Sequence, residues 1–150
     1  MTTLKNFFAA ARSGDTEVLH QHILSGVDIH SCDDLALRIA AENGRYITVE
    51  FLINHGADIH ALNDAALLWA AYYGETKTVK LLLKKGAGTE ISKENALIYA
   101  VTNNHYDVVK LLLDNGVSPD FRRGAPLNCS TKYNHKEITK LIKSYINWVV

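Results

Sequence analysis

Seven histidines are the side chains of this sequence best suited to hold a metal ion or to transfer a proton. His20 and His22 are two residues apart, a spacing that places them on different faces of a helix and makes them poor co-ligands. His55, His105 and His135 are predicted to occupy unrelated positions within their units. We therefore predict no metal site.

His30 and His60 occupy equivalent positions 30 residues apart, and Glu90 and Asp120 continue the same column. A column that changes from histidine to acidic residues along the chain lacks the clustered ligand set that a metal ion needs. We expect these side chains to hydrogen-bond the backbone of a turn.

Cys32 and Cys129 are the only cysteines, too few for a disulfide scaffold, and no Cys-x-x-Cys accompanies them. We expect buried or half-buried free thiols about 30 Å apart, beyond the reach of a disulfide of about 4.4 to 6.8 Å. The sequence also has no nucleophile motif and no Gly-rich phosphate loop. These absences predict a protein that is not an enzyme and uses no cofactor.

The elements that carry these residues repeat with a period of 30 residues. One column holds Leu37, Leu67, Leu97 and Leu127. Another holds Gly14, Gly44, Gly74, Asn104 and Asn134. Glycine and asparagine tolerate the left-handed backbone at a helix end, so each unit contains a forced helix stop.

Apolar residues follow helical spacing on both sides of each stop, so each unit is predicted to form two short antiparallel helices. Asp34 and Asp64 precede the first helix of their units and are predicted to be its N-caps. No unit can bury its apolar face alone, and we expect the units to stack into a solenoid with one continuous core. The predicted repeats are 4–33, 34–63, 64–93, 94–123 and 124–150.

The pattern Ala-Leu-x-x-Ala-Ala-x-x-Gly, then Val-x-x-Leu-Leu-x-x-Gly, runs from Ala66 to Gly86 and resembles the ankyrin repeat. The resemblance implies an all-α solenoid of about five helix-turn-helix repeats. The family repeat has about 33 residues and a Thr-Pro-Leu-His box, which Ala65-Ala66-Leu67-Leu68 replaces here. Because the missing residues fall between Gly86 and Leu97, we expect shortened β-turn fingers with little or no strand pairing.

The 30-residue form with Ala57-Asp58-Ile59-His60 is also similar to ankyrin proteins of giant DNA viruses of amoebae. That resemblance implies a viral protein that acts on a host protein in the cytoplasm of an infected cell. The N-terminus lacks the features of a signal peptide and no run is long enough for a membrane span, which predicts an intracellular protein without a membrane role.

Columns that change freely between repeats are predicted to be exposed and to bind a protein partner. At the end of each first helix, which lines the concave surface in the ankyrin family, these columns hold Glu42, Asn43, Tyr72, Tyr73, Thr102 and Asn103. Tyr72 and Tyr73 are the preferred anchors, because tyrosine is over-represented among residues that dominate binding energy; in the alternative, one of them only covers the neighbouring repeat. Secondary candidates in the turns are Leu62, Asn63, Ser92 and Lys93. The column of Ile39, Trp69, Tyr99 and Cys129 stays apolar, so Trp69 is predicted to pack between repeats.

The net charge of zero hides an acidic N-terminal half and a basic C-terminal half. The basic residues of interest are Lys77, Lys80, Lys84, Lys85, Lys93, Arg122, Arg123, Lys136, Lys140 and Lys143. They support nucleic-acid binding as a less favoured alternative, with solvated helix surface as the plainer interpretation. An acidic protein partner that docks near the C-terminal repeats is favoured over nucleic acid. Self-association through the chain ends is another alternative, since Tyr145, Ile146, Trp148, Val149 and Val150 make the C-terminus apolar. We expect this tail to fold back over the last core layer.

Overall fold

The computed structural model describes residues 2–147, and these residues form ten α-helices joined by short turns. The helices are α1 (Thr2–Ser13), α2 (Thr16–Leu24), α3 (Ser31–Glu42), α4 (Tyr46–Asn54), α5 (Ala61–Tyr73), α6 (Thr76–Lys84), α7 (Glu90–Thr102), α8 (Tyr106–Asp114), α9 (Phe121–Lys132) and α10 (Lys136–Asn147). Consecutive helices form five hairpins, and the described residues contain no strand. The predicted all-α solenoid without strand pairing is thus confirmed.

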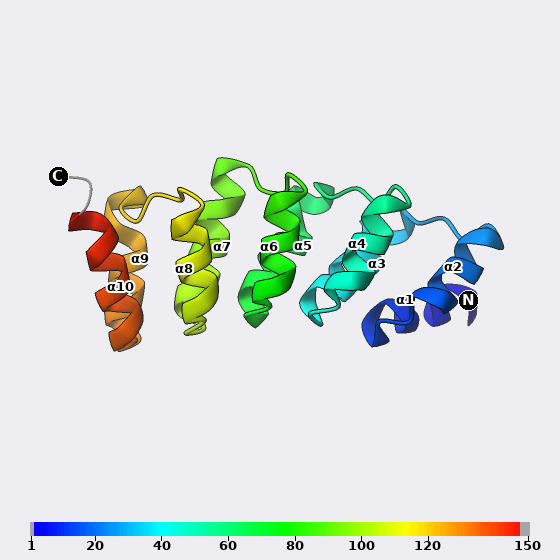
Figure 1. The fold of residues 1–150 in the computed structure, drawn as a ribbon, viewed down its shortest axis with the longest axis horizontal. Helices are drawn as coiled ribbons and strands as arrows, with labels where there is room; N and C mark the ends of the chain where they lie inside the picture. Colours follow the sequence, from blue (N-terminus) through cyan, green and yellow to red (C-terminus); the bar gives the residue numbers. More distant parts are fainter. Residues whose placement is uncertain (1, 148–150) are drawn as a thin grey trace.

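The hairpins stack side by side into an elongated array with the two chain ends at opposite tips (Figure 1). The first helices contact one another in order and form one row of α1, α3, α5, α7 and α9. The second helices α4, α6, α8 and α10 likewise pack in order into a parallel row. None of the described helices is long and apolar enough to span a bilayer. The main helix–helix contacts lie within a hairpin or between adjacent hairpins, as in other solenoids.

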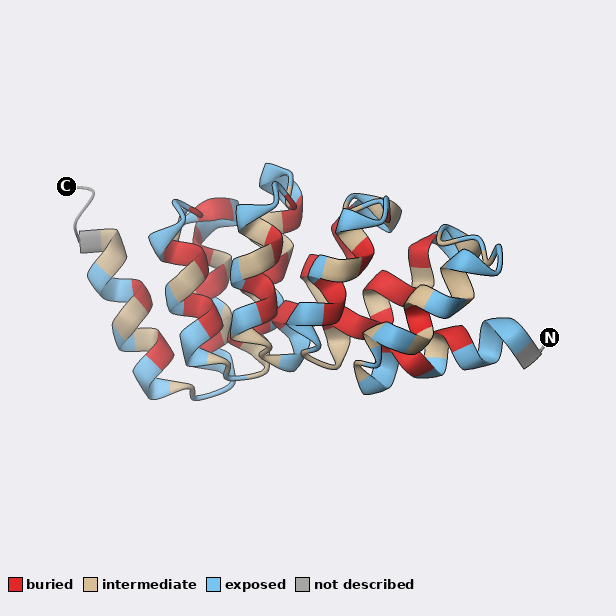
Figure 2. Cartoon of the chain, turned by 45° about the vertical axis from the view of Figure 1, so that its right-hand side comes forward, coloured by how far each residue is buried: buried red, intermediate tan, exposed pale blue. Residues whose placement is uncertain are grey.

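The core is a continuous layer between the two rows, visible as buried residues that recur from hairpin to hairpin (Figure 2). Leu67 and Leu97 of the first helices and Leu82 and Leu112 of the second helices are fully buried. Burial of each such side chain contributes about 1.5–3 kcal/mol to stability. Ala70 and Ala100 are also fully buried, and their small size allows the first helices to approach closely.

The predicted helix stops have the expected left-handed backbone. Gly74 has φ +79° and Asn104 has φ +62°, and the other three members of the column also have positive φ. The N–H group of the residue after each stop then bonds a carbonyl of the preceding helix, as Glu75 does with Ala70 at 2.9 Å. The stop thus reverses the chain into the second helix.

Candidate partner-binding surface

Each second helix is joined to the next first helix by a turn on the upper side of Figure 1, which we call the turn side. Three of these turns run into the first residues of α3, α5 and α9, where three consecutive residues have a left-handed backbone, at 32–34, 62–64 and 122–124, so that the regular part of each helix begins after them. In the second of them, Leu62, Asn63 and Asp64 have φ of 50°, 57° and 64°. Such a conformation costs a non-glycine residue roughly 1–2 kcal/mol, so other contacts must hold these turns in place.

Asp34 and Asp64 supply those contacts, and the prediction that they cap their own helices is wrong. The buried Asp64 carboxylate accepts the N–H groups of Gly88 at 3.0 Å and Thr89 at 3.1 Å, both in the next repeat. Asp34 likewise accepts the N–H of Asp58 at 2.9 Å. Their left-handed backbone turns these side chains toward the following repeat.

The histidine column at 30 and 60 bonds these carboxylates, not the turn backbone as predicted. His60 Nδ1 lies 2.8 Å from Asp64 Oδ1, and His30 Nδ1 lies 3.1 Å from Asp34 Oδ1. Burial raises the pKa of the Asp64 carboxyl, but hydrogen bonds from Ser92, Gly88, His60 and Thr89 outweigh it and bring the pKa below its ordinary value. Asp64 is therefore a charged link between repeats.

The fourth unit enters its first helix differently. Thr89 has an extended backbone and is the N-cap of α7, where its hydroxyl accepts the N–H of Ser92. Ser92, predicted to meet a partner, is only 4% exposed, and its hydroxyl oxygen lies 3.3 Å from the carbonyl oxygen of Asn63. Ser92 therefore links two repeats and is not available for binding. Lys93, the neighbouring candidate, is half-buried.

The other two turn candidates are exposed. Leu62 is 57% exposed, and Asn63 is exposed beside it. Cys32, at the equivalent position of the preceding unit, is also exposed, so the prediction that both thiols are at least half-buried holds only for Cys129. The two cysteines are free.

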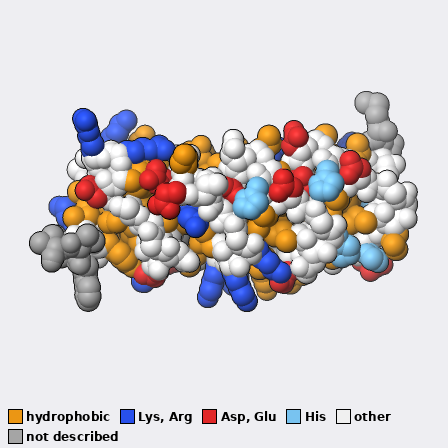
Figure 3. All heavy atoms as spheres, turned by 90° about the horizontal axis from the view of Figure 1, so that it is seen from above, with side chains coloured by type: hydrophobic (Ala, Val, Ile, Leu, Met, Phe, Trp, Pro, Cys, Tyr) orange, Lys and Arg blue, Asp and Glu red, His pale blue; other side chains and the backbone are white. Residues whose placement is uncertain are grey.

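The turn side has a marked chemical character. Figure 3 shows acidic and histidine side chains gathered along it, while most of the Lys and Arg side chains in this view lie toward its edges. Its exposed acidic residues include Asp28, Asp33, Asp58 and Glu90. This side therefore presents a row of negative charge next to the first helices.

The basic residues of the C-terminal half do not form one matching surface. Lys77, Lys80 and Lys84 are exposed on α6, a second helix, whereas Arg122 is on the turn side, 3.6 Å from Glu94. Lys85 lies 3.5 Å from Glu50, and Lys140 lies 2.9 Å from Glu137. This distribution favours solvated helix surface over a nucleic-acid site.

At the opposite ends of the first helices, one column of side chains links neighbouring repeats. His105 Nε2 donates to the carbonyl of Tyr72 at 2.8 Å, and His135 Nε2 donates to the carbonyl of Thr102 at 3.2 Å. Arg45 Nε donates to the carbonyl of Arg12 at 3.1 Å in the same way. His105 and His135 therefore share a column and a role, which corrects the prediction that their positions are unrelated.

The preferred anchors Tyr72 and Tyr73 lie at the end of α5 and are 38% and 50% exposed. Their ring centroids are 5.1 Å apart, and both rings contact Trp69 of the same helix, at 5.5 Å and 6.0 Å. Tyr99 of α7 joins them, because its ring lies 6.0 Å from Tyr72. We call Trp69, Tyr72, Tyr73 and Tyr99 the aromatic cluster.

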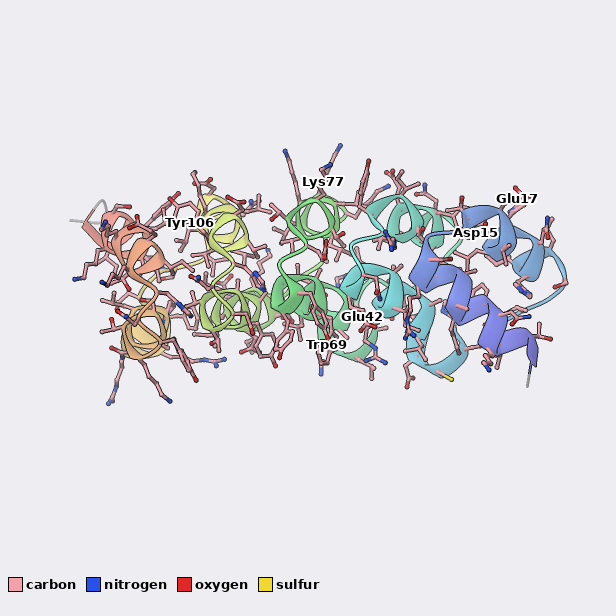
Figure 4. The ribbon with its side chains drawn as sticks, turned by 90° about the horizontal axis from the view of Figure 1, so that it is seen from below. Asp15, Glu17, Glu42, Trp69, Lys77 and Tyr106 are labelled. Atoms are coloured by element: carbon pink, nitrogen blue, oxygen red, sulfur yellow. The ribbon has the colours of Figure 1, made fainter. Side chains whose placement is uncertain are left out.

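Trp69 is half-buried, and the aromatic rings it contacts, those of Tyr72 and Tyr73, belong to its own helix. Figure 4 shows it on the side of the first-helix row that faces away from the second helices, which carry Lys77 and Tyr106. Its column runs from the buried Ile39 to Tyr99, which is 41% exposed. Apolar character alone therefore did not identify interior positions, and Tyr99 was missed as a surface residue.

A small cavity of about 150 Å³ lies within this cluster, lined by Leu68, Trp69, Tyr72 and Tyr99. Two adjacent first helices build it, because Tyr99 comes from α7 and the other three residues come from α5. The surface thus combines exposed aromatic rings with a pocket the size of a side-chain end.

The remaining candidates flank the cluster. The side-chain N–H groups of Asn43 and Asn103 donate to the carbonyls of Ile39 at 2.8 Å and Tyr99 at 2.9 Å. These two residues are therefore also the C-caps of their own helices. Glu42 and Thr102 are half-buried at the same helix ends. All four lie in the repeats next to Tyr72 and Tyr73.

The apolar C-terminus is described only as far as Asn147, so Trp148, Val149 and Val150 lie outside the described residues. Tyr145 and Ile146 of α10 are partly buried against the core. The Tyr145 hydroxyl also hydrogen-bonds Asp114 of α8. These two residues pack against the core as part of α10, and the rest of the tail that was predicted to fold back lies beyond Asn147.

A family model for ankyrin repeats, in three copies, matches residues 7–95 and 87–148. The crystal structure of the human ASB11 ankyrin repeat domain is similar, with a TM-score of 0.80 and 23% identity over 92% of this chain and 67% of that one. The comparison with curated proteins gave no match. Ankyrin repeats are generally protein–protein interaction modules and not enzymes. Because the family model matches nearly the whole sequence, this chain belongs to the ankyrin repeat family.

Proposed function

We propose that this chain is a non-catalytic module that binds a protein partner through its first-helix face, with the aromatic cluster as the anchor. The observation that carries the proposal is that four aromatic side chains contact one another yet remain partly open, three of them 38% to 50% exposed. Aromatic side chains that serve only the core are normally covered. Here three of the four, Trp69, Tyr72 and Tyr99, line a cavity near the centre of the array.

The cluster suits an anchor for a physical reason. Tyrosine and tryptophan bring a large contact area on stiff side chains, so little conformational entropy is lost when a partner covers them. Mutual ring contacts restrict these side chains before binding, which lowers that loss further. Glu42, Asn43, Thr102 and Asn103 are proposed as the polar rim, with Leu62, Asn63 and Lys93 as an outer contact.

The resemblance to ankyrin proteins of giant amoeba viruses, a prediction from the sequence, would make the partner a host protein.

An affinity pull-down from host or source-cell lysate, with captured proteins identified by mass spectrometry, tests the binding face. The bait is the intact chain, compared with the double variant Tyr72→Ala/Tyr73→Ala.

A matched control is Tyr46→Ala/Tyr106→Ala, because these tyrosines are 40% and 41% exposed but begin second helices. We expect a captured protein to disappear with the first variant and to stay with the control, at unchanged helicity. Equal capture by all three chains would refute the first-helix assignment. A mass that rises with concentration in solution would favour the self-association alternative.

A further inference from the structure

The rings of the aromatic cluster are arranged as a corner. Trp69 and Tyr72 meet at an interplanar angle of 64°, and Tyr72 and Tyr99 meet at 81°. A group in the cavity between them therefore contacts ring surfaces of different orientation. At about 150 Å³ the cavity is smaller than the roughly 300–1,000 Å³ of small-molecule sites, and it fits the end of one side chain.

The charge around this cavity favours a cation. Its lining consists of Leu68 and three aromatic side chains and contains no lysine or arginine. The faces of aromatic rings carry partial negative charge and attract cations within about 6 Å of the ring centroid. The half-buried Glu42 ends α3, at the same end of the first helices as Tyr72, and the acidic turn side with its exposed Asp33 and Asp58 lies at the other end of these helices.

The long-range field has the same sign on the N-terminal side of the cavity, whereas residues 76–150, which include Tyr99, carry a net charge of +6. Residues 1–75 contain 4 Lys/Arg and 10 Asp/Glu, a net charge of −6. A basic segment of a partner that approaches this half is attracted over the distance of a Debye length, about 8–10 Å at ordinary ionic strength. An acidic segment is repelled by both the field and the rings.

We infer that this pocket takes the guanidinium group of an arginine in a basic segment of the partner, an inference that rests on the proposed function. Arginine fits better than lysine because its planar, weakly hydrated cation stacks on aromatic faces. The hydroxyl groups of Tyr72 and Tyr99 supply acceptors for its N–H donors. The rest of the basic segment extends along the first helices toward the acidic turn side.

The test selects peptides from a displayed random library against the intact chain, with Trp69→Ala and Tyr99→Leu as comparison baits. Tyr99→Leu keeps apolar volume but removes a ring face, so it remains informative if Trp69→Ala folds poorly. We expect the enriched peptides to share an arginine and to lose enrichment on both variants. The control bait Tyr46→Ala should select the same peptides as the wild type.

A consensus peptide is then titrated in three forms, with arginine, with uncharged citrulline of nearly the same shape, and with norleucine. We expect the citrulline and norleucine forms to bind about 2- to 30-fold more weakly, the range for a cation–π contact. This arm changes only the peptide, so the folding of a variant cannot affect it.

Two failures are distinguishable. Peptides that depend on Trp69 but centre on an apolar residue, or bind equally as citrulline, would overturn the arginine assignment and leave the first-helix anchor standing. Peptides whose selection does not depend on Trp69 or Tyr99, or no enrichment at all, would overturn both the pocket and the aromatic anchor.

Discussion

The carboxylate of Asp64 accepts the backbone N–H of Gly88, 24 residues further along the chain, at 3.0 Å. Asp34 and Asp58 have the same separation and the same bond, at 2.9 Å. A buried aspartate therefore fixes the turn of one repeat to the turn of the next at two successive junctions. In a solenoid, where stability is a sum over neighbouring repeats, such a bond acts on the junction itself.

The stability of the chain should depend on the charge of Asp64. Its pKa is lowered by folding, so its contribution is fully present above the unfolded value of about 3.9 and is lost as the pH falls through the lower folded value. At pH 7 we expect Asp64→Asn to lower the free energy of unfolding by about 1–3 kcal/mol. Urea unfolding at pH 7, 5, 4 and 3 should show that this difference shrinks below pH 4.

Asp107→Asn is the matched control, because Asp107 is exposed in the first turn of α8. Its effect should be small at every pH. A difference between the wild type and Asp64→Asn that stays constant from pH 7 to pH 3 would contradict the role of the charge.

Much of the fold followed from the sequence, because the helix stops and the buried leucines are local signals. Gly74 and Asn104 predict a left-handed helix end wherever they occur. The partner of Asp64 was not predictable in this way, because it lies in another repeat and depends on a left-handed backbone that Asp seldom adopts. A position such as Tyr99 has the same apolar character whether it faces the core or a surface pocket, so only the packing of α5 against α7 distinguishes the two.

Replacement of Leu62 by glycine should stabilise the protein. Leu62 has φ +50° and an exposed side chain, so it bears the cost of a left-handed backbone and gains little from packing. Glycine removes a cost of roughly 1–2 kcal/mol but loses more entropy on folding, by about 0.5–1 kcal/mol. We expect a net gain of up to about 1 kcal/mol in thermal or urea unfolding. Leu62→Ala, which keeps the strained backbone, should show no gain, and equal behaviour of the two variants would argue against strain at this turn.

His105 and His135 provide a matched pair of variants. Each ring donates a hydrogen bond to the preceding first helix, but only His105 holds the carbonyl of Tyr72 in the aromatic cluster. We expect His105→Ala and His135→Ala each to cost about 0.5–1.5 kcal/mol in unfolding experiments. Only His105→Ala should also weaken capture of the partner in the pull-down. If both variants bind equally well, the position of Tyr72 does not matter for binding.

Gly74→Ala and Gly26→Ala separate backbone strain from the contact with His105. Both glycines have positive φ, 79° and 89°, so alanine costs roughly 1–2 kcal/mol at either position. A Cβ atom at Gly26 meets nothing within 4 Å, whereas at Gly74 it would meet the imidazole ring of His105. Because that ring would have to move and release the carbonyl of Tyr72, we expect Gly74→Ala to cost about 0.5–1.5 kcal/mol more. In a His105→Ala background this excess should vanish, and urea unfolding of the double-mutant cycle measures it directly; an excess that persists without the ring would mean that another contact resists the methyl group.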